Sequence, residues 1–137
     1  MRFGWRWGFI NNDGIFVILP QFQQTRSFRE GLAAVKIDDK WGFIDTTGAV
    51  VIPPRFDQVE DFSDSLAIAY EKERPSYIDS KGNVAIAGPF LEATPFVHGL
   101  AAVRRAGENQ VEYINRAGKT VFKYTRRPLG DRLRALH

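Results

Sequence analysis

The chain has 137 residues, a length that fits one domain with a buried core. It contains no cysteine, which excludes disulfides and thiolate metal sites, and its 44% hydrophobic and 26% charged residues are ordinary for a globular protein. No stretch approaches the roughly 18 apolar residues of a membrane span, and "MRFGWRWGFI" lacks the features of a signal peptide, so a cytoplasmic location is expected.

The net charge of +3 is concentrated at the C-terminal end of the chain. Residues 123–137 carry five basic side chains against the single acid Asp131, whereas the other 122 residues carry 14 basic and 15 acidic side chains. The body of the chain is therefore electrostatically mixed, and only its last residues form a basic segment.

The first predicted element, in chain order, is an incomplete repeat unit. "MRFGW" (1–5) stands where the first strand of a hairpin is expected, and "RWGFINNDGIFVILPQF" (6–22) continues it. The pattern returns complete in "SFREGLAAVKIDDKWGFIDTTGAVVIP" (27–53), for which we predict strands at 31–38, 41–45 and 49–53. Further copies follow at 61–87 and 95–122, and "GKTVFKY" (118–124) supplies a last strand.

Marker residues fix the period of this repeat. Steps of 34 residues separate Phe22, Phe56 and Phe90, Phe28, Phe62 and Phe96, Leu32, Leu66 and Leu100, and Ile10, Ile44 and Ile78. The step to Ile114 is 36, because "RRAGENQ" adds two residues to one connection. A fixed period predicts tandem structural units, which we place at about 7–40, 41–75 and 76–110, with a partial unit at 111–124.

A turn signal follows the second strand of each unit. It reads Asp45-Thr46-Thr47-Gly48 in one unit and recurs at 11–14, 79–82 and 115–118, with Asp or Asn first and Gly last. The first side chain can accept hydrogen bonds from backbone N–H groups of the turn, and glycine suits the left-handed conformation that closes it. Each signal therefore predicts a tight hairpin turn.

Prolines predict where the third strand of a unit ends, and apolar spacing predicts the structure of the tail. Pro20, Pro53 and Pro54 are expected to end the third strand, because proline cannot donate to a ladder. The crossover from Phe56 to Phe62 is predicted as either an extended segment or a single helical turn. In the tail, residues 125–137, the helical spacing of Leu129, Leu133 and Leu136 favours a short capping helix.

These elements predict an all-β fold in which three-stranded antiparallel meanders of about 34 residues stack in an open, twisted array. A single three-stranded unit cannot bury both of its faces, so each unit is expected to pack on its neighbour. Closure into a propeller-like or barrel-like arrangement is the alternative.

The segment "KWGFIDTTGAVVIPPRFDQVEDFSDSLA" resembles the WG-repeat (KWG-repeat) family, found largely in bacterial proteins. The third unit departs from the family pattern with Pro75 and Ser76 in place of Trp-Gly, and the fourth departs with Val111 and Glu112. The resemblance covers about residues 5–122 and implies a β-rich repeat module without catalytic residues. The positions assigned to the structure of the repeat are Trp7, Gly8, Trp41, Gly42, Ile44, Asp45, Gly48, Pro54, Phe56, Phe62, Leu66, Asp79, Gly82, Phe90, Phe96, Gly99, Leu100 and Gly118.

The tryptophans permit two interpretations. At a fixed repeat position, Trp7 and Trp41 are expected to pack between units, since aromatic side chains dominate core burial. The alternative is an aromatic shelf for a sugar or a peptide. Trp5 lies outside the repeat pattern, so an exposed Trp5 would be the better candidate for contact with a partner.

Catalytic and metal chemistry find little support in the sequence. The Asp-x-x-Gly turns offer one carboxylate each, whereas calcium takes six to eight oxygens, so no metal site and no cofactor are predicted. His98 is expected at the surface, because Glu30 and Asp64 occupy its position in earlier units. No nucleophile elbow, phosphate-binding loop or dinucleotide fingerprint is present, and we expect no enzymatic activity.

Departures from the repeat mark the candidate partner-binding residues, which are Trp5, Arg104, Arg105, Arg126, Arg127, Arg132 and Arg134. We expect a non-enzymatic module that binds another protein through a face or edge of the array, as an adaptor or a toxin-neutralising immunity protein. One alternative is binding of a glycan or cell-envelope ligand by exposed aromatics. The other is weak nucleic-acid binding by the tail, against which stands a solvated capping helix with its arginines outward; only Tyr124 is interleaved with the arginines, so sequence-specific RNA reading is not indicated. The sequence leaves the partner and the oligomeric state open.

Overall fold

The computed structural model of the chain describes residues 2–3, 6–88, 90–105, 107 and 109–125. The described residues form fifteen β-strands and no helix, arranged as four antiparallel sheets in chain order. Sheet 1 contains β1 (Arg2–Phe3), β2 (Arg6–Ile10) and β3 (Phe16–Phe22). Sheet 2 contains β4 (Gln24–Thr25), β5 (Ala33–Ile37), β6 (Lys40–Ile44) and β7 (Val50–Phe56). Sheet 3 contains β8 (Gln58–Val59), β9 (Ala67–Glu71), β10 (Arg74–Ile78) and β11 (Val84–Ile86), and sheet 4 contains β12 (Phe90–Ala93), β13 (Leu100–Arg105), β14 (Gln110–Asn115) and β15 (Thr120–Thr125).

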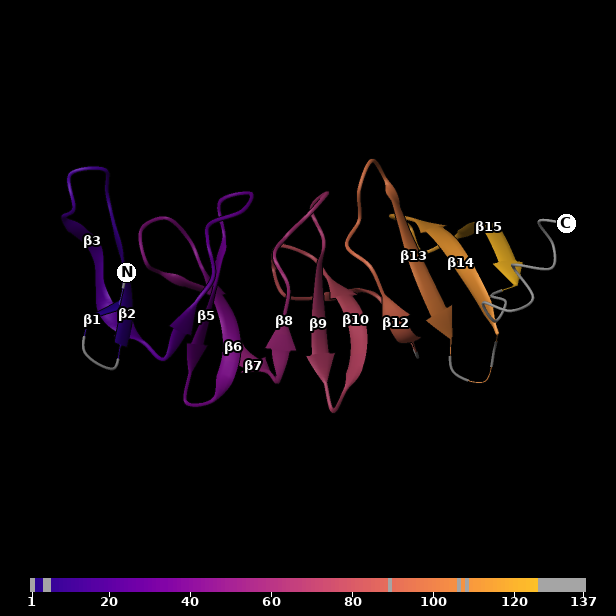
Figure 1. Cartoon of the computed structure of the whole chain (residues 1–137), viewed down its shortest axis with the longest axis horizontal. Coiled ribbons are helices and arrows are strands. Elements are labelled where there is room, and N and C mark those ends of the chain that lie inside the picture. Colours follow the sequence, from indigo (N-terminus) through magenta and orange to yellow (C-terminus); the bar gives the residue numbers. More distant parts are fainter. Residues whose placement is uncertain (1, 4–5, 89, 106, 108, 126–137) are drawn as a thin grey trace, which may run out of the picture.

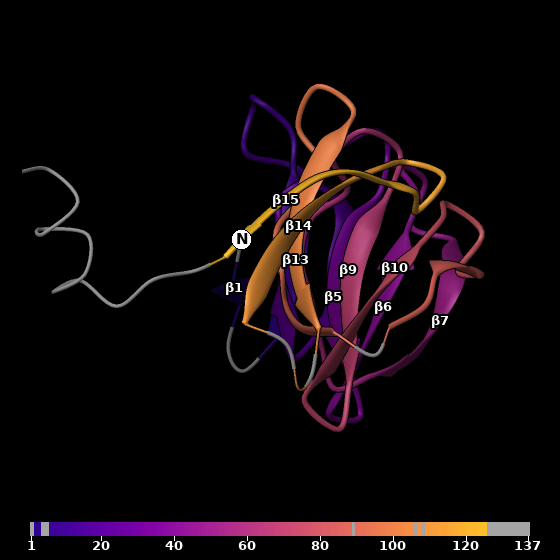
Figure 2. The same ribbon diagram turned by 90° about the vertical axis from the view of Figure 1, so that its right-hand side faces the viewer.

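The sheets follow one another along the long axis of the molecule. Sheet 1 lies at one end and sheet 4 at the other, without closure into a ring (Figure 1). Seen along that axis, the strands of sheet 4 stand in front of those of the earlier sheets (Figure 2). The predicted open stack of antiparallel units is therefore confirmed.

The crossover from Phe56 to Phe62, for which the sequence predicts either an extended segment or a single helical turn, contains a short strand. The segment after Phe56 is extended, and its strand β8 pairs with β9 in sheet 3, whereas β7, directly before it in the chain, belongs to sheet 2. Equivalent strands β4 and β12 pair with β5 and β13. The three predicted strands of each later unit thus become four, and the stacking unit begins at the crossover instead of at the tryptophan.

Three apolar clusters fill the spaces between successive sheets. Alternate residues of one strand supply different clusters: Ala33 and Val35 face sheet 1, whereas Ala34 faces sheet 3. Side chains of adjacent residues point to opposite faces of a strand, so sheets 2 and 3 are buried on both faces. Small alanines on the central strands allow this two-sided contact. The largest fully buried side chains are Tyr77, Phe43, Phe56, Phe90 and Phe96.

The prediction that Pro20, Pro53 and Pro54 end a strand is wrong. β3 and β7 run through these prolines to Phe22 and Phe56, and both strands lie at a sheet edge. The pairing register shifts here, because Trp41 pairs with Phe56 while Phe43, only two residues on, pairs with Ile52. Proline is tolerated inside such a bulge on an edge strand, where the ladder requires no N–H donor.

The glycines that follow Trp7 and Trp41 permit this bulge. A Cβ on Gly42 would lie 2.4 Å from the carbonyl oxygen of Ile52, and one on Gly8 would lie 2.5 Å from that of Ile18. Only a residue without a side chain fits such a close approach. Where the third unit has Ser76, the partner strand β11 ends early at Ile86.

The predicted hairpin turns are confirmed in all four units. Oδ1 of Asp45 accepts hydrogen bonds from the N–H groups of Thr47 (2.9 Å) and Ala49 (3.1 Å) and from the Thr47 hydroxyl (2.6 Å). The bond from that hydroxyl is the main reason why the pKa of Asp45 is lowered. Asn11, Asp79 and Asn115 accept the same pair of backbone bonds in their own turns.

A second set of turns links the units to one another. The two-residue turns Glu30-Gly31, Asp64-Ser65 and His98-Gly99 all have positive φ at both positions, as tight hairpins require. The Glu30 carboxylate accepts a hydrogen bond from the N–H of Ser65 at 2.9 Å, and Asp64 accepts one from that of Gly99 at 2.6 Å. We call this series the turn ladder. His98, at the last turn, is exposed as expected.

Candidate interaction surface

Four shallow clefts meet along the crossovers, and we call them together the crossover groove. One cleft, of about 400 Å³, is lined by Trp7, Gln24, Thr25, Arg26, Trp41 and Gln58. Arg26 also lines two of the other clefts, and Gln58 also lines a cleft formed by residues of the β8–β9 part of sheet 3. Since neighbouring clefts share these residues, the clefts that make up the groove adjoin one another from sheet 1 to sheet 3.

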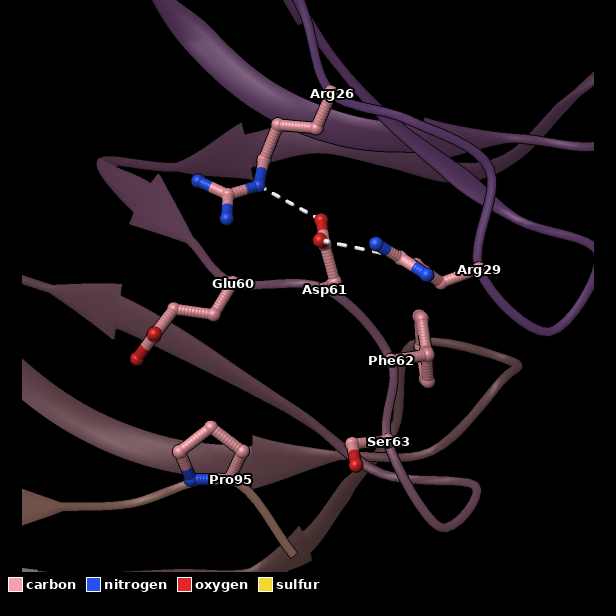
Figure 3. Close-up of a pocket in the computed structure, with 7 residues that line it drawn as sticks. All are labelled: Arg26, Arg29, Glu60, Asp61, Phe62, Ser63 and Pro95. Carbon is pink, nitrogen blue, oxygen red and sulfur yellow. Dashed lines mark hydrogen bonds and ion pairs between the residues drawn. The ribbon is translucent and has the colours of Figure 1, made fainter.

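The centre of the groove is held by an ion pair between two crossovers. Arg26 Nε lies 2.7 Å from Asp61 Oδ1, while Arg29 Nε lies 3.9 Å from Asp61 Oδ2. Figure 3 shows both arginines reaching Asp61, with the terminal nitrogens of Arg26 directed away from it and with Pro95 on the other side of the cleft. The Arg26 side chain remains 42% exposed, so its guanidinium can still meet a partner.

The two repeat tryptophans line one cleft of the groove. Trp7 and Trp41 are each partly exposed, and Trp41 also packs against the apolar cluster between sheets 2 and 3. Trp41 can therefore pack between units and still present part of its ring to a ligand. Gln24 and Gln58, also one repeat apart, bring a side-chain amide from each crossover to the same cleft.

Sheet 3 and the residues that flank its strands contribute charged side chains at the end of the groove. The carboxylate of Asp57 bonds to the Lys40 ammonium and accepts a 2.7 Å hydrogen bond from the N–H of Lys72. The bond from Lys40 is the main cause that lowers the pKa of Asp57. Burial, helped by Glu60, raises the pKa of Tyr70. At neutral pH the carboxylate is therefore charged and the phenol neutral.

The structure places the predicted Arg104 and Arg105 on opposite faces of β13. Arg105 Nε lies 2.9 Å from Oε2 of Glu112, a buried carboxylate, and its guanidinium stacks 5.0 Å from the Phe90 ring centroid. Arg104 Nη2 pairs with Glu92 Oε1 at 2.7 Å. Both guanidinium groups thus make ion pairs within the fold, and the structure does not bring them together.

The other predicted partner-binding residues lie outside the described residues. They are Trp5, Arg126, Arg127, Arg132 and Arg134, and the predicted C-terminal capping helix lies outside as well.

The sequence reading missed the crossover groove. Its central residues, Gln24, Arg26, Gln58 and Asp61, lie in segments that we expected only to connect the units. The 34-residue step from Gln24 to Gln58 was the available signal, because equal positions in stacked units lie on one side of the array. Pairing of Arg26 with Asp61 across 35 positions had no local signal.

Two classes of site find no support in the described part of the chain. Within it, no three His, Cys, Asp or Glu side chains are grouped to hold a metal ion. Nor do these residues include a helix long and apolar enough to cross a membrane.

Comparison with known proteins identifies the family of the repeat. No curated protein matches the chain. The family described as "WG containing repeat" matches residues 7–41, 41–73 and 76–107, which is most of the chain and includes the third unit without its Trp-Gly pair. The chain belongs to the WG containing repeat family.

Proposed function

We propose that this chain is a non-enzymatic interaction module that binds an extended segment of another protein along the crossover groove. The observation that supports this most directly is the series of adjoining clefts along the crossovers, three of which share the exposed side chain of Arg26. Stacked repeats commonly use such extended surfaces for protein recognition.

The residue types along the groove suit a polypeptide ligand. Tryptophan, tyrosine and arginine are the side chains most enriched at binding hot spots, and the groove presents Trp7, Trp41, Tyr70 and Arg26. The amides of Gln24 and Gln58 can donate to and accept from a peptide backbone. Open clefts of about 300–400 Å³ suit successive side chains better than one enclosed small molecule.

The titration behaviour of the groove favours binding over catalysis. A general acid or base works best with a pKa near the operating pH. Asp57 shifts downward and Tyr70 shifts upward, so both pKa values move away from neutrality. Asp57 therefore stays charged and Tyr70 stays neutral near neutral pH, which suits recognition better than proton transfer by these two groups.

Affinity capture from the native host with Arg26→Ala and Arg116→Ala tests the proposal. Arg116 is an exposed arginine in the turn between β14 and β15, away from the groove, and serves as the matched control. The Arg26 variant should bind the captured partner about tenfold more weakly, while the Arg116 variant binds normally. Capture of no partner above background at several salt concentrations would contradict the proposal, as would equal losses in both variants.

A second candidate ligand is a glycan, favoured by the shared cleft of Trp7 and Trp41. An aromatic ring can stack on the apolar face of a sugar while the neighbouring amides bond its hydroxyls. Titration of the tryptophan fluorescence with a panel of glycans separates this ligand from a peptide. A spectrum that stays unshifted throughout removes the glycan candidate.

A further inference from the structure

The last sheet leaves uncovered a face that is buried in the sheets before it. In sheet 3, the face toward sheet 4 contains Leu66 and Ile86, each 7% exposed, and Tyr77, which is fully buried. The equivalent residues of sheet 4 are Leu100, Tyr113 and Phe122. Leu100 is 42% exposed and Phe122 is 58% exposed.

This forward face of sheet 4 carries an aromatic patch. The ring centroids of Tyr113, Phe122 and Tyr124 lie 6.0, 6.2 and 6.3 Å from one another, and Tyr124 is 44% exposed. Terminal units of repeat arrays normally have a polar outer face, which keeps them soluble. A clustered aromatic patch at the end of an array instead marks a surface that docks something.

The opposite end of the molecule exposes the matching half of the interface. Ile44, Ile78 and Ile114 each insert toward the preceding sheet and are fully buried, whereas the equivalent Ile10 of sheet 1 is 39% exposed. Sheet 1 therefore presents an uncovered rear face.

At every internal interface, the glycine of a hairpin turn lies close to an isoleucine side chain of the preceding sheet, and this contact is missing at both ends. Cβ atoms placed on Gly48, Gly82 and Gly118 would lie 3.5, 3.0 and 3.3 Å from an isoleucine side chain of the preceding sheet, Ile18, Ile52 and Ile86 respectively. At Gly14, in sheet 1, such a Cβ would meet no described atom within 4 Å. Phe122, which stands at the isoleucine position of sheet 4, is exposed.

We propose that a second copy of this chain stacks head to tail on the first, with the rear face of its sheet 1 on the forward face of sheet 4. Phe122 of one copy then packs against Gly14 and Ile10 of the next, as Ile86 packs against Gly118 within the chain. The contact continues an interface that already occurs three times in the fold. It involves the ends of the array and is independent of the crossover groove.

An interface of this kind joins two different surfaces, so it does not close after two copies. Assembly should be linear, and the mean length should grow with protein concentration. Blocking either end of a chain should then limit growth, and two chains blocked at opposite ends should still form one complete interface.

Sedimentation of the full chain from about 10 μM to about 1 mM tests the proposal. Wild type should pass from monomers to species longer than dimers. Ile10→Asp and Phe122→Asp should each weaken self-association at least about tenfold, because each places a charge in an apolar contact. An equimolar mixture of the two variants should stop at the mass of two chains.

Two further variants keep a folding defect from being mistaken for a blocked interface. Gly14→Asn should leave the monomer folded, because the added side chain meets free space and asparagine tolerates positive φ. It should still block assembly, because the side chain would stand in the contact with Phe122 of the other copy. Val84→Asp is the control for Phe122→Asp, because Val84 is about as exposed as Phe122 but lies on the flank of the array. It should leave assembly intact. A wild type that stays monomeric overturns the proposal. If deletion of residues 126–137 then releases association, the occupant of the forward face is the chain's own tail.

Discussion

At the scale of single residues, Gly42 shows how one missing Cβ shapes a unit. We expect Gly42→Ala to lower the free energy of unfolding by about 3 kcal/mol, because a methyl group 2.4 Å from the Ile52 carbonyl forces the bulge open. Gly31→Ala is the control: it adds a methyl group in free space, at φ 81°, and should cost only about 1 kcal/mol. Urea unfolding measures both losses, and equal losses would show that the close approach is unimportant.

Glu112 makes stability depend on pH. The Thr120 hydroxyl (2.6 Å) and Arg105 (2.9 Å) bond its buried carboxylate and hold its pKa below the usual value of 4.5. Its stabilisation is therefore complete above the pKa of the unfolded chain and is lost as pH falls through the lower pKa of the folded chain. Glu112→Gln should cost about 2 kcal/mol at pH 7 and less as the pH falls below about 4.

Unfolding curves at several pH values check this expectation. Glu92→Gln is the matched control, since Glu92 also pairs with an arginine but its side chain is 55% exposed. The pH dependence of the Glu92 variant should stay close to that of wild type. A loss for Glu112→Gln that is constant from pH 7 to pH 3 would contradict the role of its carboxylate.

At the scale of elements, the turn ladder ties each hairpin to the next one. Asp64→Gly removes the carboxylate that accepts from Gly99 while keeping a residue suited to φ 51°. We expect a loss of about 1 kcal/mol and faster hydrogen exchange at the Gly99 amide. His98→Gly is the control, because it places glycine at the same position of the last turn. Hydrogen exchange at the Ser65 amide, which donates to Glu30, should not change in this variant. Unchanged exchange at Gly99 in the Asp64 variant would show that the ladder bond carries no stability.

At the scale of the whole molecule, the periodic features and the stacking of units were predictable, whereas the particular pairings between segments were not. The recurrence of Ile44 and Asp45 with a 34-residue period was enough to predict stacked hairpins. Asp45 acts through the local geometry of its turn, and Ile44 marks the apolar face that packs on the preceding sheet. Pro54 misled the sequence reading, because a bulge on an edge strand depends on tertiary pairing with Trp41. The groove around Arg26 was missed for the same reason: its ion pair joins two crossovers that no local pattern connects.

The turn ladder also bears on how quickly this chain can fold. Its bonds, like the Arg26–Asp61 pair, join positions only 35 apart, so each sheet docks on a neighbour that is close in sequence. Folding slows as the mean sequence separation of contacts grows, which is why sandwiches with distant strand pairings are slow. A stack of meanders avoids those long loop closures. One formed pair of sheets can act as the nucleus on which the remaining sheets add in either direction along the chain.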